Sequence, residues 1–239
     1  MRGRSFAGCL GLMVLVPLSA GGCSQVVSGT PAPDPVVAKI PRMTPDQIPN
    51  VLLTTGEMNP LVSSSSLTQK FENTSPTTPN FTYDQPTCGP MVYTGDADTY
   101  GNQWNGYRLR SYREPGDNYN HAIFQTVTTF ANFLVAEDLV AKYRDILAQC
   151  QNKDVLNTPK DPKDGSPSTL HITQVAHNSD PSADSVDWTT GATGDSWVCS
   201  DTMRTEGNVV IEVSSCANSD ARTAAVIADR IAAKIQQQS

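Results

Sequence analysis

The chain has 239 residues, of which 38% are hydrophobic and 17% are charged, and its formal net charge at pH 7 is −7. These values are typical of a globular protein with one sizeable domain. The acidic net charge and the lack of a basic patch or cationic run argue against nucleic acid as a partner and against binding to anionic lipid through a polybasic surface.

The first 22 residues have the pattern of a secretory signal. Arg2 and Arg4 form a basic start, and the apolar run that follows is too short for a membrane span of roughly 20 residues. The run ends in AGGC at positions 20–23, which resembles a bacterial lipobox. Residues 1–22 are therefore predicted to be a lipoprotein signal peptide, and Cys23 is predicted to carry acyl chains that hold the protein to the membrane. The alternative is an ordinary signal peptide that is cleaved nearby and leaves a soluble secreted protein.

Residues 23–43 are predicted to form an extended tether. The segment holds four prolines, which favour solvated, non-helical backbone. The folded domain is then expected over residues 44–239. It is predicted to begin with a short helix, in which Thr44 caps the N-terminus, Pro45 takes the first helical position and Gln47 completes a capping box.

The middle of the chain alternates between strand and helix patterns. Residues 63–90 read as a surface loop, and residues 107–113 and 121–130 read as two strands. From Phe133 to Cys150 the apolar residues recur at spacings of three and four, which predicts one buried face of a helix. A loop is predicted next, followed by a strand at TLHITQVAH (169–177). The chain is predicted to end in a helix whose apolar stripe is Ala224, Ile227, Ala228, Ile231 and Ile235.

Gly207-Asn208 lies between two β-prone runs and predicts a two-residue hairpin turn. A hairpin centred there places Cys199 opposite Cys216, at a separation that suits a disulfide. Cys88 and Cys150 would then form the second disulfide. The alternative, four free or metal-bound thiols, would need a reducing compartment or CxxC spacing, and this chain has neither.

The order of these segments resembles the PknH-like extracellular sensor domain family of mycobacteria, over roughly residues 43–237. The resemblance is carried by LLTTGEM (52–58), Cys88, QWNGYRLRSY (103–112), HAIFQTVTTF (121–130), Cys150, WVC (197–199) and VSSC (213–216). It implies an α+β fold, in which helices pack on an antiparallel β-sheet with two disulfides and a broad cleft suggested to bind a ligand. The lipobox-like segment, together with the missing kinase and transmembrane segments, predicts a free-standing, lipid-anchored member of the family. Relatives often have Trp just before the second cysteine, whereas this chain has ILAQC.

The sequence contains no convincing catalytic or metal-binding motif. The segment TGDSW (193–197) contains Gly-Asp-Ser, as SGNH esterases do, but no histidine follows it. His171 and His177 lie about 20 Å apart on one predicted strand and cannot share a metal ion. Two calcium-loop-like segments lack an oxygen ligand at the twelfth position. The protein is therefore predicted not to be an enzyme and to need no cofactor.

The candidate ligand-binding residues are Arg108, Arg110, Tyr112 and His121. Arg108 and Arg110 would share one face of a strand and could recognise an anionic or sugar-like ligand in an otherwise negative protein. The alternative is that the arginines simply pair with surface acids. The predicted function is a lipid-anchored, ligand-binding or sensor-type domain of the cell envelope, whose partner is an unknown small molecule or envelope ligand. A carrier of lipid or glycolipid and a protein-interaction module are the alternatives.

Overall fold

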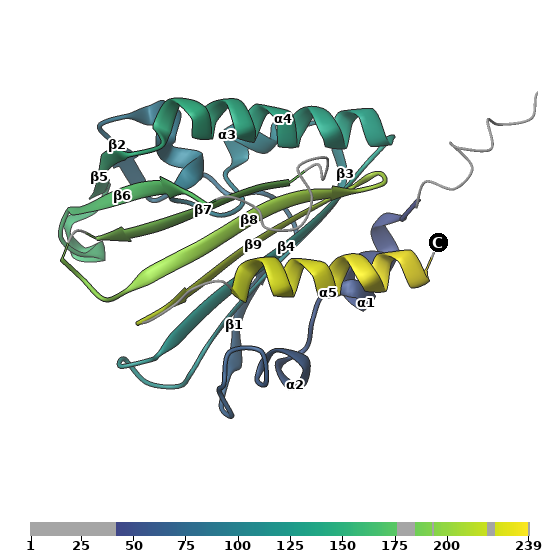
Figure 1. Cartoon of the computed structure of the whole chain (residues 1–239), viewed down its shortest axis with the longest axis horizontal. Helices are drawn as coiled ribbons and strands as arrows, with labels where there is room; N and C mark the ends of the chain where they lie inside the picture. Colours follow the sequence, from purple (N-terminus) through teal and green to yellow (C-terminus); the bar gives the residue numbers. More distant parts are fainter. Residues whose placement is uncertain (1–41, 176–184, 193, 219–222, 239) are drawn as a thin grey trace, which may run out of the picture. The chain divides into compact units, whose positions relative to one another are not determined.

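A nine-stranded antiparallel sheet forms the centre of the part of the chain that the structure describes (Figure 1). The structure is a computed structural model that describes residues 42–175, 185–192, 194–218 and 223–238. The strand order is β1-β3-β4-β9-β8-β7-β6-β5-β2. The predicted signal peptide, Cys23 and nearly all of the predicted tether lie outside the described residues.

The strands vary in length from three to ten residues. Their bounds are β1 Thr68–Asn73, β2 Phe81–Tyr83, β3 Trp104–Arg113, β4 His121–Phe130, β5 Lys153–Pro159, β6 Ser168–Gln174, β7 Ser185–Ala192, β8 Val198–Glu206 and β9 Val209–Ala217. The α-helices are α1 Ile48–Val51, α2 Thr55–Met58, α3 Ala97–Tyr100, α4 Phe133–Cys150 and α5 Thr223–Gln237. The 3₁₀ helices among the described residues are η2 Pro45–Gln47, η3 Pro86–Met91 and η4 Pro162–Asp164. The predicted α+β class is confirmed.

The β8–β9 hairpin has the predicted register. Glu206 pairs with Val209 across the turn, and Cys199 pairs with Cys216 at the far end. Gly207 supplies the positive φ that the turn needs. The side chain of Asn208 exchanges hydrogen bonds with both backbone groups of Met43, which ties the hairpin to the start of the domain.

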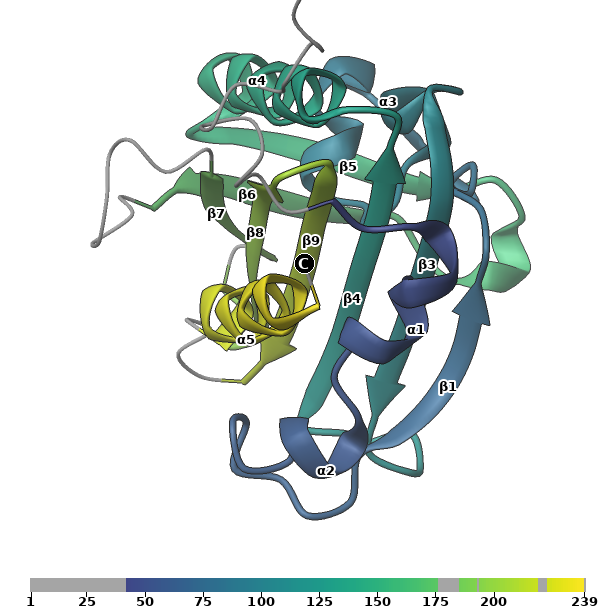
Figure 2. The same cartoon turned by 90° about the vertical axis from the view of Figure 1, so that its right-hand side faces the viewer.

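Helices cover the two faces of the sheet in separate layers, as Figure 2 shows for α4 on one side and for α5 and α1 on the other. Side chains alternate between the faces along β9. Val209, Ile211 and Val213 join the core beneath α5, whereas Val210 joins the core beneath α4. The apolar stripes predicted on both long helices are buried, apart from the half-buried Phe133 at the start of α4.

Both predicted disulfides are confirmed. Cys88–Cys150 joins η3 to the last turn of α4 and closes a separation of 62 residues. Cys199–Cys216 joins β8 to β9. The predicted N-terminal capping box is also present, because the backbone N–H of Thr44 donates to Oε1 of Gln47.

The loop predictions for residues 63–90 and for the segment after Cys150 are wrong. They contain β1, β2 and β5, and β7 has no counterpart among the predicted strands. β1 and β2 are the two edge strands, and each pairs with a segment far away in the sequence, which explains why no local pattern revealed them. β7 is an interior strand between β6 and β8. The strand predicted at 169–177 is β6, and its last two residues fall outside the described part.

Candidate ligand-binding cavity

A cavity of about 610 Å³ opens on the face of the sheet that also carries α4. Phe71 of β1 and Phe81 of β2 both line it, although these strands form the two opposite edges of the sheet. The sheet therefore curves around this space, and its central strands form the floor. Residues 92–94, which follow η3, supply a further part of the wall.

The cavity exists because α4 covers only part of this face. The same alternating positions of β9 are Val210, Glu212, Ser214 and Cys216. Val210 packs in the core under α4, and Glu212 is buried against Tyr143 of that helix. Ser214 and Cys216 lie further along the strand and line the cavity.

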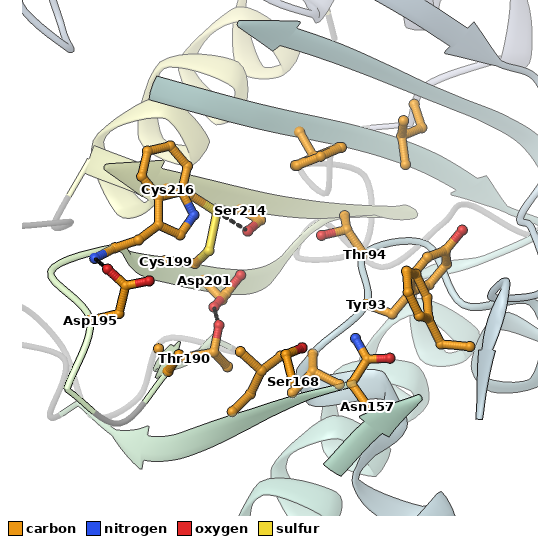
Figure 3. A pocket seen from close by; sticks show the side chains of 18 of the residues that line it. Tyr93, Thr94, Asn157, Ser168, Thr190, Asp195, Cys199, Asp201, Ser214 and Cys216 are labelled. Atoms are coloured by element: carbon orange, nitrogen blue, oxygen red, sulfur yellow. Dashed lines mark hydrogen bonds between the residues drawn. A yellow bond between two sulfur atoms is a disulfide. The ribbon is translucent and has the colours of Figure 1, made fainter. Parts of the chain in front are cut away.

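Polar groups and the Cys199–Cys216 disulfide lie together on β8 and β9 at one side of the cavity (Figure 3). Asp201 of β8 is paired in register with Ser214 of β9 and is only 7% exposed. The hydroxyl of Thr190 on β7 donates to Oδ2 of Asp201 over 3.4 Å. Burial raises the pKa of Asp201 to about 7, although hydrogen bonds from Ser214 and Thr190 oppose the increase.

The other walls combine apolar and polar side chains. Tyr93 and Thr94 come from the segment after η3, and Asn157 and Ser168 come from β5 and β6 (Figure 3). The apolar contribution includes the aromatic rings of Phe71 and Phe124, whose centroids are 6.3 Å apart, together with Leu109, Leu170 and Trp197. A surface of this mixed kind is typical of small-molecule sites.

The buried carboxyl group of Glu212, which does not line the cavity, binds the end of segment 92–95 through a hydrogen bond. Glu212 is 2% exposed, and its Oε2 accepts from the backbone N–H of Gly95 at 3.0 Å and from the hydroxyl of Tyr100 at 2.7 Å. The hydroxyl of Tyr143 lies 3.5 Å from the other oxygen. Burial raises the pKa of Glu212 to about 8, against the hydrogen bonds from Tyr100 and Gly95. Glu212 thereby positions the cavity wall without lining the cavity.

The backbone conformation and close packing at position 95 require a glycine. Its φ is +75°, and a Cβ built there would lie 2.2 Å from the hydroxyl oxygen of Tyr107. Both facts exclude a larger residue without movement of the backbone or of the tyrosine.

The four residues predicted to bind ligand do not line this cavity. Arg108 and Arg110 project to the opposite face of β3 from Leu109, and both pair with Glu72 of β1. Tyr112 is buried in the core beneath α5, where its hydroxyl donates to the carbonyl of Leu53. Nδ1 of His121 lies 2.6 Å from Oε1 of Glu114. A ligand-binding role for these four stays a prediction.

Sequence reasoning missed the residues of the cavity, although one signal was present. The predicted hairpin register already places Asp201 opposite Ser214, two residues inward from Cys199–Cys216. A carboxylate and a hydroxyl facing inward on two central strands are unusual, because buried polar groups need a local reason. Other parts of the wall come from β1, β2, β5 and β7, which the sequence did not reveal, whereas Leu109, Phe124 and Leu170 belong to strands that were predicted.

These features define the class of protein. It is a disulfide-bonded α+β domain, of the type built for an oxidising compartment, with a pocket on one face of a curved antiparallel sheet. The chain belongs to the PknH-like extracellular domain family, whose model matches residues 43–234.

The individual relatives are kinases, and this chain resembles only one part of each. The serine/threonine-protein kinase PknH of Mycobacterium tuberculosis (strain CDC 1551 / Oshkosh) is 27% identical over 244 residues, which cover 97% of this chain and 35% of the kinase. PknH of Mycobacterium bovis is 28% identical over 216 residues, which cover 86% of this chain and 33% of the kinase. The chain thus spans about a third of the length of these relatives.

A solved structure shares the fold. The crystal structure of the extracellular domain of PknH from Mycobacterium tuberculosis matches with a TM-score of 0.75 at 25% sequence identity, over 82% of this chain and 98% of that one. In the described part of this chain, no helix is long and apolar enough to cross a membrane. The same residues contain no cluster of three or more His, Cys, Asp or Glu side chains that could hold a metal ion.

Proposed function

We propose that this protein is a lipid-anchored, non-catalytic domain on the outer face of the cell membrane, which binds a small amphipathic ligand. The cavity beside α4 carries this proposal. Its volume of about 610 Å³ lies within the ordinary range of small-molecule sites, and its walls offer aromatic surface as well as polar groups. The lipobox at residues 20–23 and membership of an extracellular domain family support the location.

Binding explains the lining of the cavity better than catalysis does. The described lining contains carboxyl, hydroxyl and amide groups but no histidine or lysine, and its two cysteines are joined in a disulfide. Acid–base or nucleophilic chemistry needs a base or nucleophile that converges with a second group on one reacting atom. The polar groups are instead distributed around the walls, as suits the orientation of a bound molecule.

Carriage of a lipid or glycolipid is a second candidate for the same cavity. The aromatic and aliphatic side chains of Phe71, Phe81, Phe124 and Leu170 favour it, because they offer a surface for an acyl chain. A protein-interaction module receives less support. The large apolar side chains that are most exposed, such as Leu134 and Val226, come from separate elements of the fold.

Titration with the apolar fluorophore N-phenyl-1-naphthylamine tests the cavity. We expect saturable binding to the unchanged domain and at least ten-fold weaker binding to the Ala192→Trp variant, because Ala192 lines the cavity and the indole would fill it. Val226→Trp is the matched control, since Val226 is 45% exposed on α5 and should accept a tryptophan without effect on binding. Equal binding to all three proteins would contradict the proposal.

Lipidation is tested separately on the full chain. We expect the intact mass of the membrane-bound protein to include acyl chains on Cys23, and we expect Cys23→Ser to release the protein from the membrane fraction. Ser24→Ala is the control and should stay attached. An unmodified Cys23 in a membrane-bound protein would overturn this part of the proposal.

A further inference from the structure

The charged groups that line the cavity are all acidic in the part of the chain that the structure describes. Asp201 lies at the β8–β9 side and Asp195 lies in the segment between β7 and β8, whereas no arginine or lysine is among the lining residues. Arg113 lies near this region, with its guanidinium carbon 4.8 Å from the ring centroid of Tyr119. It does not line the cavity itself.

An anionic head group would meet no compensating charge in this cavity. A phosphate or carboxylate that entered would lose water and would lie among carboxyl groups, which costs free energy unless a cation is within reach. The opposite holds for a cation, because an ammonium group can pair with a carboxylate that is already buried. The burial that raises the pKa of Asp201 to about 7 shows that water alone solvates this carboxyl poorly.

Aromatic rings add a second preference for positive charge. Tyr119 and Trp197 line the cavity and also an adjoining open depression, and their ring centroids are 5.5 Å apart in an edge-to-face arrangement. Asp117 and Asp195 line the same depression. Arg113 already lies over one face of the Tyr119 ring. The ring of Trp197 and the carboxylates of Asp117 and Asp195 are therefore the groups that favour a cationic molecule at this entrance.

We propose that the ligand of this cavity is a singly cationic amphiphile, whose ammonium head pairs with Asp201 and whose apolar part lies against Phe71, Phe81 and Phe124. This inference rests on the proposed ligand-binding function and names the chemical class of the ligand. It differs from the expectation drawn from Arg108 and Arg110, which favoured an anionic or sugar-like ligand and concerned the opposite face of β3.

The test compares three amphiphiles that share a dodecyl chain and differ in the head group. They are dodecylammonium, dodecyl phosphate and dodecyl maltoside, each used below its micelle concentration to displace N-phenyl-1-naphthylamine from the unchanged domain. We expect the ammonium compound to displace the fluorophore at a concentration at least ten-fold lower than the phosphate does. Equal potency of the three, or a preference for the phosphate or the maltoside, would overturn the inference and leave the binding function standing.

Two substitutions locate the effect. Asp201→Asn keeps the size and hydrogen-bonding capacity of the side chain, and we expect it to weaken the ammonium compound about ten-fold while it leaves the maltoside unchanged. Asp145→Asn, which removes the same charge at an exposed position of α4 that does not line the cavity, should leave the preference among head groups intact. An unchanged ammonium affinity in a folded Asp201→Asn variant would overturn the pairing, and the comparison of head groups on the unchanged protein stands even if that variant fails to fold. No binding of the fluorophore or of any amphiphile would contradict the proposed function as well.

Discussion

Replacing Glu212 by Gln should make the stability of the domain much less sensitive to pH. The group lies behind the cavity wall, where it accepts hydrogen bonds from the backbone of Gly95 and from the hydroxyl of Tyr100. Its pKa of about 8 means that the carboxyl group is mostly protonated in the folded protein at neutral pH. Gln has the same shape and no charge, so it can accept the same two hydrogen bonds.

The sign and size of the effect follow from proton linkage. Between the ordinary pKa of 4.5 and the folded value of about 8, the folded protein binds a proton that the unfolded chain has lost. The free energy of unfolding therefore falls as pH rises through this window, by up to about 1.4 kcal/mol per pH unit. From pH 5 to pH 7.5 the contribution of Glu212 amounts to a loss of about 3 kcal/mol. The Gln variant should lack this loss.

The assay is urea unfolding with intact disulfides at several values of pH between 5 and 7.5, in the unchanged protein and in Glu212→Gln. Asp201→Asn should reduce the slope in the same direction, because the pKa of Asp201 is also raised, to about 7. Glu72→Gln provides a control of opposite sign, for which the unfolding series is extended below pH 5, because the contribution of Glu72 is lost only as pH falls below its ordinary pKa of 4.5. Although partial burial opposes it, the hydrogen bond and charges of Arg110 and Arg108 lower the pKa of Glu72, so this carboxylate stabilises the fold at neutral pH and loses that effect in acid.

If Glu212→Gln and the unchanged protein have parallel pH profiles between pH 5 and 7.5, Glu212 is ionised in the folded state at neutral pH. The description of Glu212 as a buried, neutral group that supports the cavity wall through hydrogen bonds would then be wrong.

Three further substitutions test the supports of the fold, each by urea unfolding with far-ultraviolet circular dichroism as a check of structure. Replacing both Cys88 and Cys150 by Ala should cost about 4 kcal/mol, because the disulfide closes 62 residues; an unchanged midpoint would contradict this. Gly95→Ala should cost about 1–3 kcal/mol through its positive φ and the crowding by Tyr107. Gly116→Ala is the control for the crowding and should cost less, because Gly116 also has a positive φ but its added Cβ meets open space. Asn208→Ala should cost more than 1 kcal/mol, since it removes buried hydrogen bonds to the start of the domain and to the end of β4, and a loss near zero would show that these bonds are not needed.

Local signals in the sequence predicted the centre of the fold well. The Gly207-Asn208 turn determines the register of β8 and β9, and that register alone brings Cys199 opposite Cys216. The long helices α4 and α5 also follow from their apolar spacing, since each buries one stripe against a sheet. Elements of this kind are predictable because their determinants lie within a few residues of each other.

The cavity could not be predicted in the same way. Its walls depend on the edge strands β1 and β2, which are short or polar and pair with segments far away in the sequence. Arg108 and Arg110 were attractive candidates because they are cations in an acidic chain, yet the unpredicted strand β1 supplies Glu72 as their partner. The predicted hairpin register already places Asp201 opposite Ser214. No sequence pattern near these two residues shows that α4 leaves them uncovered.

The three tryptophans offer the most direct test of the claim that this cavity binds a ligand. Trp197 lines the cavity, whereas the indole N–H groups of Trp104 and Trp188 donate to the carbonyls of Gly101 and Met91 at positions that do not line it. In a ¹⁵N–¹H spectrum recorded during titration with N-phenyl-1-naphthylamine, we expect a saturable shift of the Trp197 indole signal while the signals of Trp104 and Trp188 stay in place. A Trp197 signal that does not respond, or three signals that move together, would contradict it.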